Sequence, residues 1–209
     1  MSALDMLREE NDRYMKTFGE SALVKLVRSC GGDGAATVRA RIADHLQVWS
    51  DTFQRVMLVR AALETEESLS RLASAHLLEE IGHNRLLAEG RDGRDAEWDP
   101  VVAAASAWFV DRMTISTADE RIVLAHLVLE GSGLVFLGTA SAVYGESGYF
   151  GLHSEADQEH LELGYRALGE RAGWRPEDVR RVLDEGWQVM TALCDRIAER
   201  AAPVTGRTS

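Results

Sequence analysis

Residues 117–144, with the sequence TADERIVLAHLVLEGSGLVFLGTASAVY, contain a long apolar stretch in which Glu130 is the sole formal charge between Ile122 and Gly145. A stretch of this length is sufficient to cross a bilayer. However, His126, Glu130 and several Ser, Thr and Gly residues interrupt it, and a glutamate in lipid is costly. We therefore interpret it as the buried core helix of a globular protein. Buried there, the Glu130 carboxylate requires a partner, because an isolated buried charge is unfavourable.

The composition of the chain is that of an ordinary globular protein. Its 209 residues are enough for one domain with a sizeable core, and 45% are hydrophobic and 27% charged. The net charge of -11 disfavours nucleic acid and anionic lipid, so we expect neither a nucleic-acid nor a membrane partner. Cys30 and Cys194 are too few for a disulfide framework, and residues 1–13 lack the apolar segment of a signal peptide, so a cytoplasmic location is expected.

The pattern along the chain predicts helices separated by short breaks. Few prolines occur, and no strand-like alternation is present. The expected helices cover about 4–18, 21–29, 37–63, 68–88, 100–113, 117–144, 150–171 and 176–201. The fold class is thus all-α, a single-domain bundle of about seven helices over residues 1–202, followed by a disordered tail, 203–209.

Four of the six histidines belong to two copies of one pattern, in which a histidine is followed by an acid four residues later and by a second histidine seven residues later. The two triplets are His76, Glu80 and His83, and His153, Asp157 and His160. On a helix that turns about 100° per residue, steps of four and seven return to within about 40° of the starting direction. Each triplet is therefore expected to form one narrow stripe on its helix.

The third element is Glu130, with His126 four residues before it on the same predicted face. Three helices would then direct imidazole and carboxylate groups into one cavity of a bundle. This mixture suits iron, and the absence of thiolates from the set disfavours a structural zinc site. Glu80, Glu130 and Asp157 are candidates to bridge two ions, so we predict a pair of iron ions that activates dioxygen.

Other histidines and acids near these patterns have simpler interpretations. Three interpretations fit His126 equally well: packing in the core, contact with a ligand, or ligation itself. His45 is given no role. Glu79 lies one residue step from Glu80 and is expected to face solvent, as are two acids off the second stripe, Glu155 and Glu159.

These segments also resemble a known family. Residues 75–90, 129–131 and 152–164 are similar to the ligand helices of the heme-oxygenase-like diiron oxidases and oxygenases, whose fold is shared with heme oxygenase, thiaminase II and pyrroloquinoline quinone synthase. Glu80 and His83 look like the early ligands of that family, Glu130 like the middle one, and the triplet His153, Asp157 and His160 like the late ones. Some members use a glutamate seven residues before the early histidine. Here that position is His76, so its role as a ligand stays open.

The resemblance implies an activity. Two ferrous ions, the second held weakly, would use dioxygen as co-substrate to oxidise or oxygenate a small molecule, amino-acid-like or fatty-acid-like, in specialised metabolism. The outcomes in that family include N-oxygenation, carbon–carbon cleavage, desaturation and decarboxylation. We also expect a homodimer, as the commonest assembly of soluble proteins, and an external electron donor.

Three alternatives use the same residues. A thiaminase-like hydrolase or a metal-free oxidase would use the histidines and acids for proton transfer. A non-catalytic iron-binding protein would store or sense the metal, and heme binding by one histidine would leave the acids unexplained. A substrate pocket would be lined by some of the aromatic residues Trp49, Phe53, Trp108, Phe109, Phe136, Tyr144, Tyr149 and Phe150, with Arg85 and Arg166 as candidate carboxylate-binding residues.

Overall fold

A computed structural model describes residues 1–32, 35–145, 148–151 and 156–203, with the backbone alone for Ala156 and Asp157. The described residues are predominantly helical and contain no strand, which confirms the predicted all-α class. The elements are α1 (Ala3–Phe18), α2 (Ala22–Ser29), α3 (Ala36–Leu63), α4 (Glu67–Glu80), α5 (His83–Glu89), α6 (Pro100–Ile115), α7 (Ala118–Ile122), η2 (Val123–Leu129), α8 (Glu130–Tyr144), η3 (Gly148–Phe150), α9 (Ala156–Gly169) and α10 (Pro176–Ala201).

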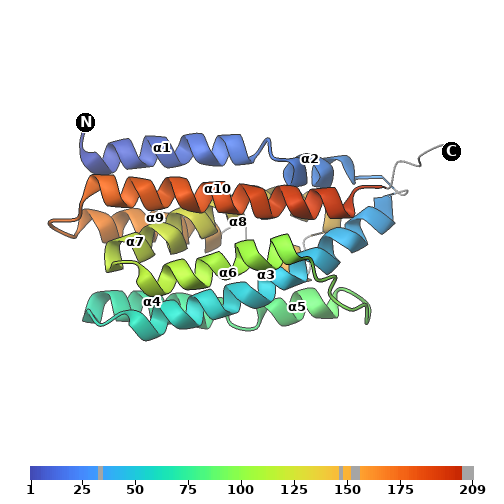
Figure 1. Ribbon diagram of the computed structural model, residues 1–209, viewed down its shortest axis with the longest axis horizontal. Coiled ribbons are helices and arrows are strands. Elements are labelled where there is room, and N and C mark those ends of the chain that lie inside the picture. The colour runs from blue at the N-terminus through green and yellow to red at the C-terminus, as the bar shows by residue number, and fades with distance from the viewer. Residues whose placement is uncertain (33–34, 146–147, 152–155, 204–209) are drawn as a thin grey trace.

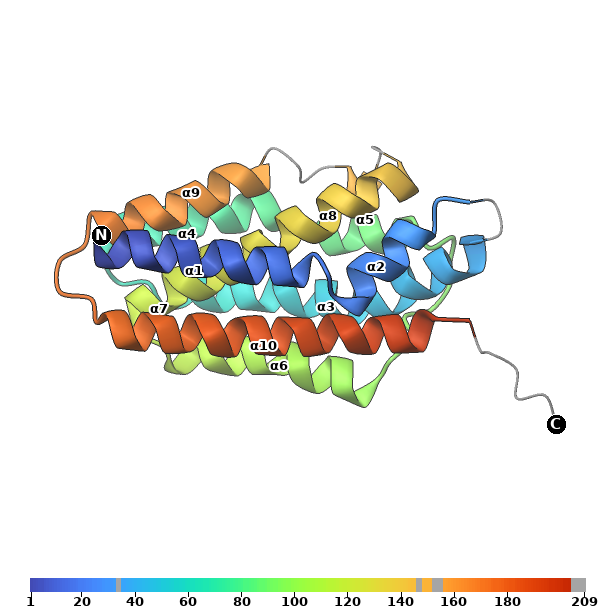
Figure 2. The same ribbon diagram turned by 90° about the horizontal axis from the view of Figure 1, so that it is seen from above.

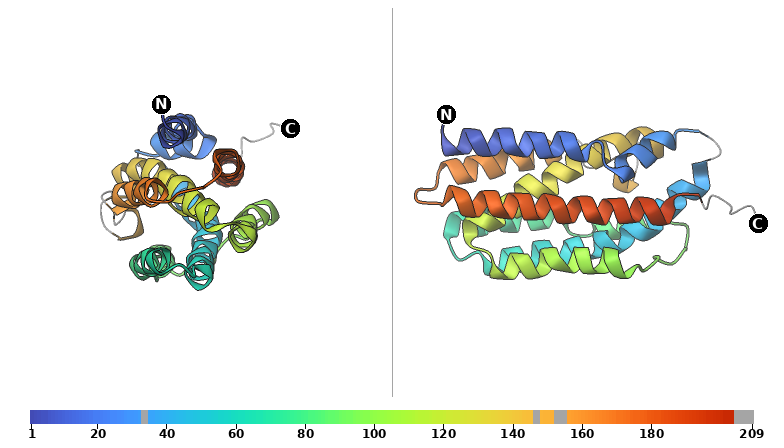
Figure 3. Two further views of the ribbon diagram at one scale, coloured as in Figure 1. Left: turned by 90° about the vertical axis from the view of Figure 1, so that its left-hand side faces the viewer. Right: turned by 45° about the horizontal axis from the view of Figure 1, so that its top comes forward.

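The helices run roughly along the long axis of an elongated bundle (Figure 1). Seen from above, α1 lies over the bundle, and α10 runs beside α6 for most of its length (Figure 2). The end-on view places the continuous α7–η2–α8 helix among the others (Figure 3). Its η2 segment packs against both α9 and α10.

Burial of the apolar helix follows the prediction. The span Ala118–Tyr144 is long and apolar enough to cross a membrane, yet 72% of its most apolar window is buried inside the protein. Every residue from Ile122 to Ser132 is buried, so the apolar side chains of this span face other helices. The stretch therefore serves as the central core helix.

Local signals place several helix ends correctly. Thr117 and Glu120 form a capping box, in which each side chain bonds the backbone N–H of the other residue. Pro176 opens α10, where its missing N–H costs no hydrogen bond. The early predicted bounds lie within about one or two residues of α1, α2 and α3, as expected for helix termini.

Two predicted helices differ from regular α-helices. The expected continuous helix over residues 68–88 is wrong, because Ile81 is extended and Gly82 has a left-handed φ of 93°. This break separates α4 from α5. In the apolar helix, Val123–Leu129 is a π-helix with wider turns, a feature common at functional sites.

Two glycines allow neighbouring helices to approach the π-helix closely. A Cβ added at Gly164 of α9 would overlap the Cβ of His126, and one added at Gly186 of α10 would lie 2.9 Å from Val128 Cγ2. Such contacts are shorter than packed carbon atoms allow. The absence of a side chain at these positions therefore sets how closely α9 and α10 approach η2.

We predict that Gly164→Ala lowers the free energy of unfolding by about 2 kcal/mol or more, because α9 would have to move away from η2. Gly138→Ala is the matched control, since a Cβ at this other helical glycine meets no atom within 4 Å. That control should raise stability by up to about 1 kcal/mol through helix propensity. Urea denaturation measures both, and equal effects would contradict the close packing.

Candidate metal centre

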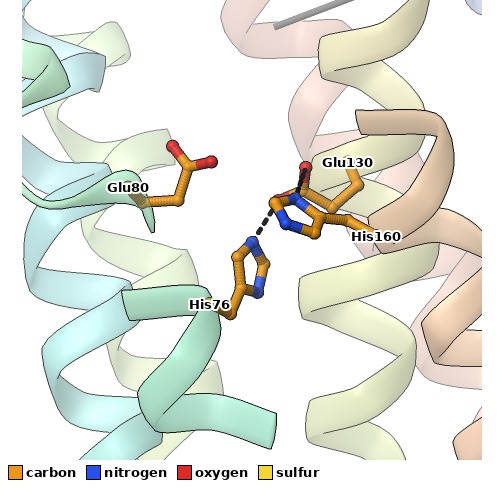
Figure 4. Close-up of side chains that lie close together, drawn as sticks. All are labelled: His76, Glu80, Glu130 and His160. Carbon is orange, nitrogen blue, oxygen red and sulfur yellow. Dashed lines mark hydrogen bonds and ion pairs between the residues drawn. The ribbon is translucent and has the colours of Figure 1, made fainter. Parts of the chain in front are cut away.

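Four buried side chains from three helical segments converge on one point. His76 and Glu80 come from α4, Glu130 is the first residue of α8, and His160 comes from α9. One ligand atom of each lies within 4.8 Å of the others, the geometry of a group that can hold a metal ion. Figure 4 shows the α4 side chains approaching Glu130 and His160 from the opposite side.

The α4 pair follows the predicted spacing, because residues four apart lie on the same face of a helix. His83 does not continue this stripe, since it begins α5 beyond the break. Its Nδ1 nevertheless lies 2.9 Å from Glu80 Oε2. Gln54 of α3 stabilises the break, donating to the Glu80 carbonyl oxygen at 2.9 Å and accepting from the Gly82 N–H at 2.9 Å. Hence His83 lies beside Glu80 because the chain breaks between α4 and α5, and not because the two residues share one helix face as predicted.

Glu130 is the centre of the hydrogen-bond network. Its Oε1 lies 2.8 Å from His76 Nε2, and its Oε2 lies 3.2 Å from His160 Nδ1. Burial by itself would raise the pKa of Glu130, but its electrostatic interactions and hydrogen bonds with His76 and His160 hold that pKa well below its usual value. The carboxylate is therefore ionised within the core, as its two imidazole partners require.

His160 connects this buried acid to the surface. Burial lowers the pKa of an imidazole, but the hydrogen bonds to Glu130 and Glu79 together raise the pKa of His160 to about 9. Its Nε2 lies 2.5 Å from Glu79 Oε2. The Glu79 side chain is 60% exposed, so the expected exposure to solvent is correct. The prediction missed its contact with His160, which comes from a helix distant in sequence.

Arg60 of α3 is the residue of the site that sequence reasoning missed. It is 1% exposed and lies between two histidines, with Nη1 2.9 Å from His76 Nδ1 and Nη2 2.7 Å from His126 Nε2. Burial lowers the pKa of Arg60 to about 10, while the negative charges of Glu64 and Glu130 favour its charged form. Arg60 is therefore a buried cation beside the candidate ligands.

His126 does not join the four clustered side chains. Its burial, followed by the positive charge of Arg60, lowers the pKa of His126 well below its usual value, so the ring is neutral. Its position in the π-helix directs Nε2 at Arg60. Of the three interpretations from sequence, packing beside the candidate ligands fits this geometry, since the His126 ring also stacks on the ring of His76.

The remaining predicted residues divide into two groups. His153 and the side chain of Asp157 lie outside the described residues, so the late triplet is represented by His160. His45 has its Nδ1 3.0 Å from the Glu97 carbonyl oxygen and is not part of the clustered group.

An apolar cavity of about 70 Å³ adjoins the cluster. Glu80, His83 and Glu130 form part of its wall, and the rest is mainly aliphatic and aromatic. Four of the eight aromatic candidates line it, namely Trp49, Phe53, Phe136 and Tyr149, whereas Arg85 and Arg166 do not. No lysine or arginine is among the described residues that line this cavity. The wall suits an apolar molecule placed next to the candidate ligands.

The donor set fits a first-row transition metal. Two imidazoles and two carboxylates are suitable ligands for iron, and no thiolate lies among the four clustered residues. Without a metal, the acids are balanced by His160 and Arg60. The group can therefore exist as a hydrogen-bonded network and can also offer lone pairs to a cation.

Comparisons with known proteins identify the fold. A crystal structure of a domain of unknown function with a heme oxygenase-like fold, from Shewanella denitrificans OS217, superposes with a TM-score of 0.67 at 15% identity, covering 95% of this chain and 93% of that one. The protein thus has a heme-oxygenase-like fold, as the sequence resemblance implied. In sequence, it is 29% identical over 203 residues to an uncharacterized protein, RP592, of Rickettsia prowazekii (strain Madrid E), covering 95% of this chain and 96% of that protein. No family model matches the chain.

We predict that Gly82→Ala destabilises the protein by about 1–2 kcal/mol, because alanine is strained at a left-handed φ. Gly90→Ala is the control, since Gly90 has an ordinary φ of -67°. Thermal or urea denaturation compares the two variants. If alanine at position 82 were stabilising, a continuous helix from α4 to α5 would be indicated instead.

Proposed function

We propose that the protein is a non-heme iron enzyme of the oxidase or oxygenase class, which uses two iron ions and dioxygen to oxidise a small apolar molecule. The observation that supports this most is the convergence of Glu80, Glu130 and His160 at one buried point beside an apolar cavity. Carboxylate and imidazole groups without thiolate are typical ligands of iron sites that react with dioxygen.

The proposed ligands are Glu80, His83, Glu130, His153, Asp157 and His160. Glu130 has a ligand atom within 4.8 Å of those of Glu80 and His160, so its carboxylate would help these residues to hold the metal. Iron bound there would supply the capacity to bind and reduce dioxygen, which protein side chains lack.

The protein's own residues have separate roles. The apolar wall formed by Trp49, Phe53 and Phe136 would hold the substrate and keep water from the reacting centre. With one nitrogen of His160 on the metal, its remaining N–H would donate to Glu79, which would orient the ring. The homodimer, the external electron donor, the cytoplasmic location and the amino-acid-like or fatty-acid-like substrate stay predictions.

One observation favours a second candidate, a metal-free enzyme on the same fold. The carboxylate of Glu130 already has hydrogen-bond partners in His76 and His160, and His160 and Arg60 supply balancing positive charge, so no metal is needed to explain its burial. In that case Glu130, which lines the cavity, would transfer protons to and from a substrate there, with His160 hydrogen-bonded to its second oxygen. Substrate turnover in the absence of any ferrous iron would favour this alternative.

We predict that anaerobic titration with ferrous iron reaches about two ions per chain, and that oxygen then gives a transient visible absorption band, as expected for a site with two metal ions. His160→Ala should abolish the band, because it removes a proposed ligand. The control is His45→Gln, which changes a buried histidine that contacts the Glu97 carbonyl oxygen and lies outside the cluster. An unchanged band in His160→Ala would contradict the proposed site.

A further inference from the structure

The contact between Arg60 and His76 fixes which nitrogen of His76 accepts a hydrogen bond. Arg60 Nη1 lies 2.9 Å from His76 Nδ1 in a buried environment. A guanidinium group has only donors and keeps its proton in proteins. Nδ1 of His76 must therefore be an unprotonated acceptor, because an N–H at that position would oppose the N–H of Arg60.

The other side of the His76 ring completes the assignment. A neutral imidazole carries one N–H, so the proton of His76 is on Nε2. This nitrogen lies 2.8 Å from Glu130 Oε1, an acceptor. Donors and acceptors thus match along the whole path from Arg60 through His76 to Glu130.

This direction of hydrogen bonding conflicts with metal ligation by His76. Its Nε2 is the nitrogen that faces Glu130, and ligation would require a lone pair there. The proton would then move to Nδ1, directly against Arg60. A histidine that binds a metal normally donates its second N–H to a carboxylate, a carbonyl or water, whereas here the second nitrogen faces a cation.

We propose that Arg60 holds His76 as a hydrogen-bond donor to Glu130, so that His76 positions this carboxylate and is not itself a metal ligand. The statement that His76 is not a ligand rests on the proposed metal site. The protonation pattern of His76 does not, because it is a property of the protein without metal. It answers the question that the sequence left open, by placing His76 outside the ligand set.

The first test is NMR of the ¹⁵N-labelled, metal-free protein, using two-bond correlations between the imidazole nitrogens and ring protons. The His76 signals are assigned by their loss in His76→Gln. We expect Nδ1 at the chemical shift of an unprotonated nitrogen and Nε2 at that of a protonated one. A protonated Nδ1 in His76 would overturn the proposal.

Arg60→Met is the matched variant, because it keeps an unbranched side chain and removes both the donors and the charge. His76 should then lose its fixed pattern and exchange between its two neutral forms, which the same spectrum reports. An unchanged His76 pattern in folded Arg60→Met would show that Arg60 does not determine it. Should this variant not fold, the wild-type spectrum alone decides the protonation pattern.

The second test adds zinc, a diamagnetic probe that binds the same nitrogen and oxygen ligands. The His160 signals should move to the metal-bound range while those of His76 keep their pattern. His76→Gln, which retains an N–H donor, should weaken zinc binding by about tenfold or less, near the lower limit for residues that support a ligand. His160→Ala should weaken it far more.

The outcomes separate this inference from the proposed function. A His76 Nε2 signal that moves on zinc binding would make His76 a ligand and overturn the inference. Failure of zinc and ferrous iron to bind the wild-type protein would instead contradict the proposed function. The metal-free spectrum would still show whether Arg60 makes His76 a donor to Glu130.

Discussion

Glu130 is 3% exposed and lies within the most deeply buried part of the central helix, where an ionised carboxylate is several kcal/mol less favourable than in water unless it is compensated. Its compensation comes from outside its own helix. His76 of α4 and His160 of α9 each hydrogen-bond one of its oxygens, and Arg60 of α3 extends the network through His76. The need to neutralise this acid thus couples four separate parts of the chain.

The departures from regular helix lie close to this network. The π-helix Val123–Leu129 ends immediately before Glu130, and the break at Gly82 lies between Glu80 and His83. The π-helix packs closely against α9 at Gly164, and the side chain of Gln54 hydrogen-bonds the backbone on both sides of the break. Such irregular backbone persists where the surrounding packing determines it, and it is often found near functional groups.

A heme-oxygenase-like fold does not by itself define an activity, because one fold can carry unrelated sites. The proposed iron chemistry therefore depends on the particular side chains that meet at the cavity. The same residues make a stable hydrogen-bonded network without metal, in which Arg60 and His160 supply positive charge. A bound cation would compete with these positive charges for the Glu130 carboxylate. Glu130 therefore takes part both in the network without metal and in the metal site.

The sequence by itself determined most helix bounds, the burial of the apolar helix and the pairing of His76 with Glu80, because caps, prolines and helical spacing act over a few residues. It also indicated that Glu130 needs partners. Only the tertiary structure decided that Arg60 faces His76 and His126 and that Glu79 reaches His160. The residues of these pairs are 16 to 81 positions apart along the chain. Their contacts therefore depend on how distant helices pack, which no local sequence pattern specifies.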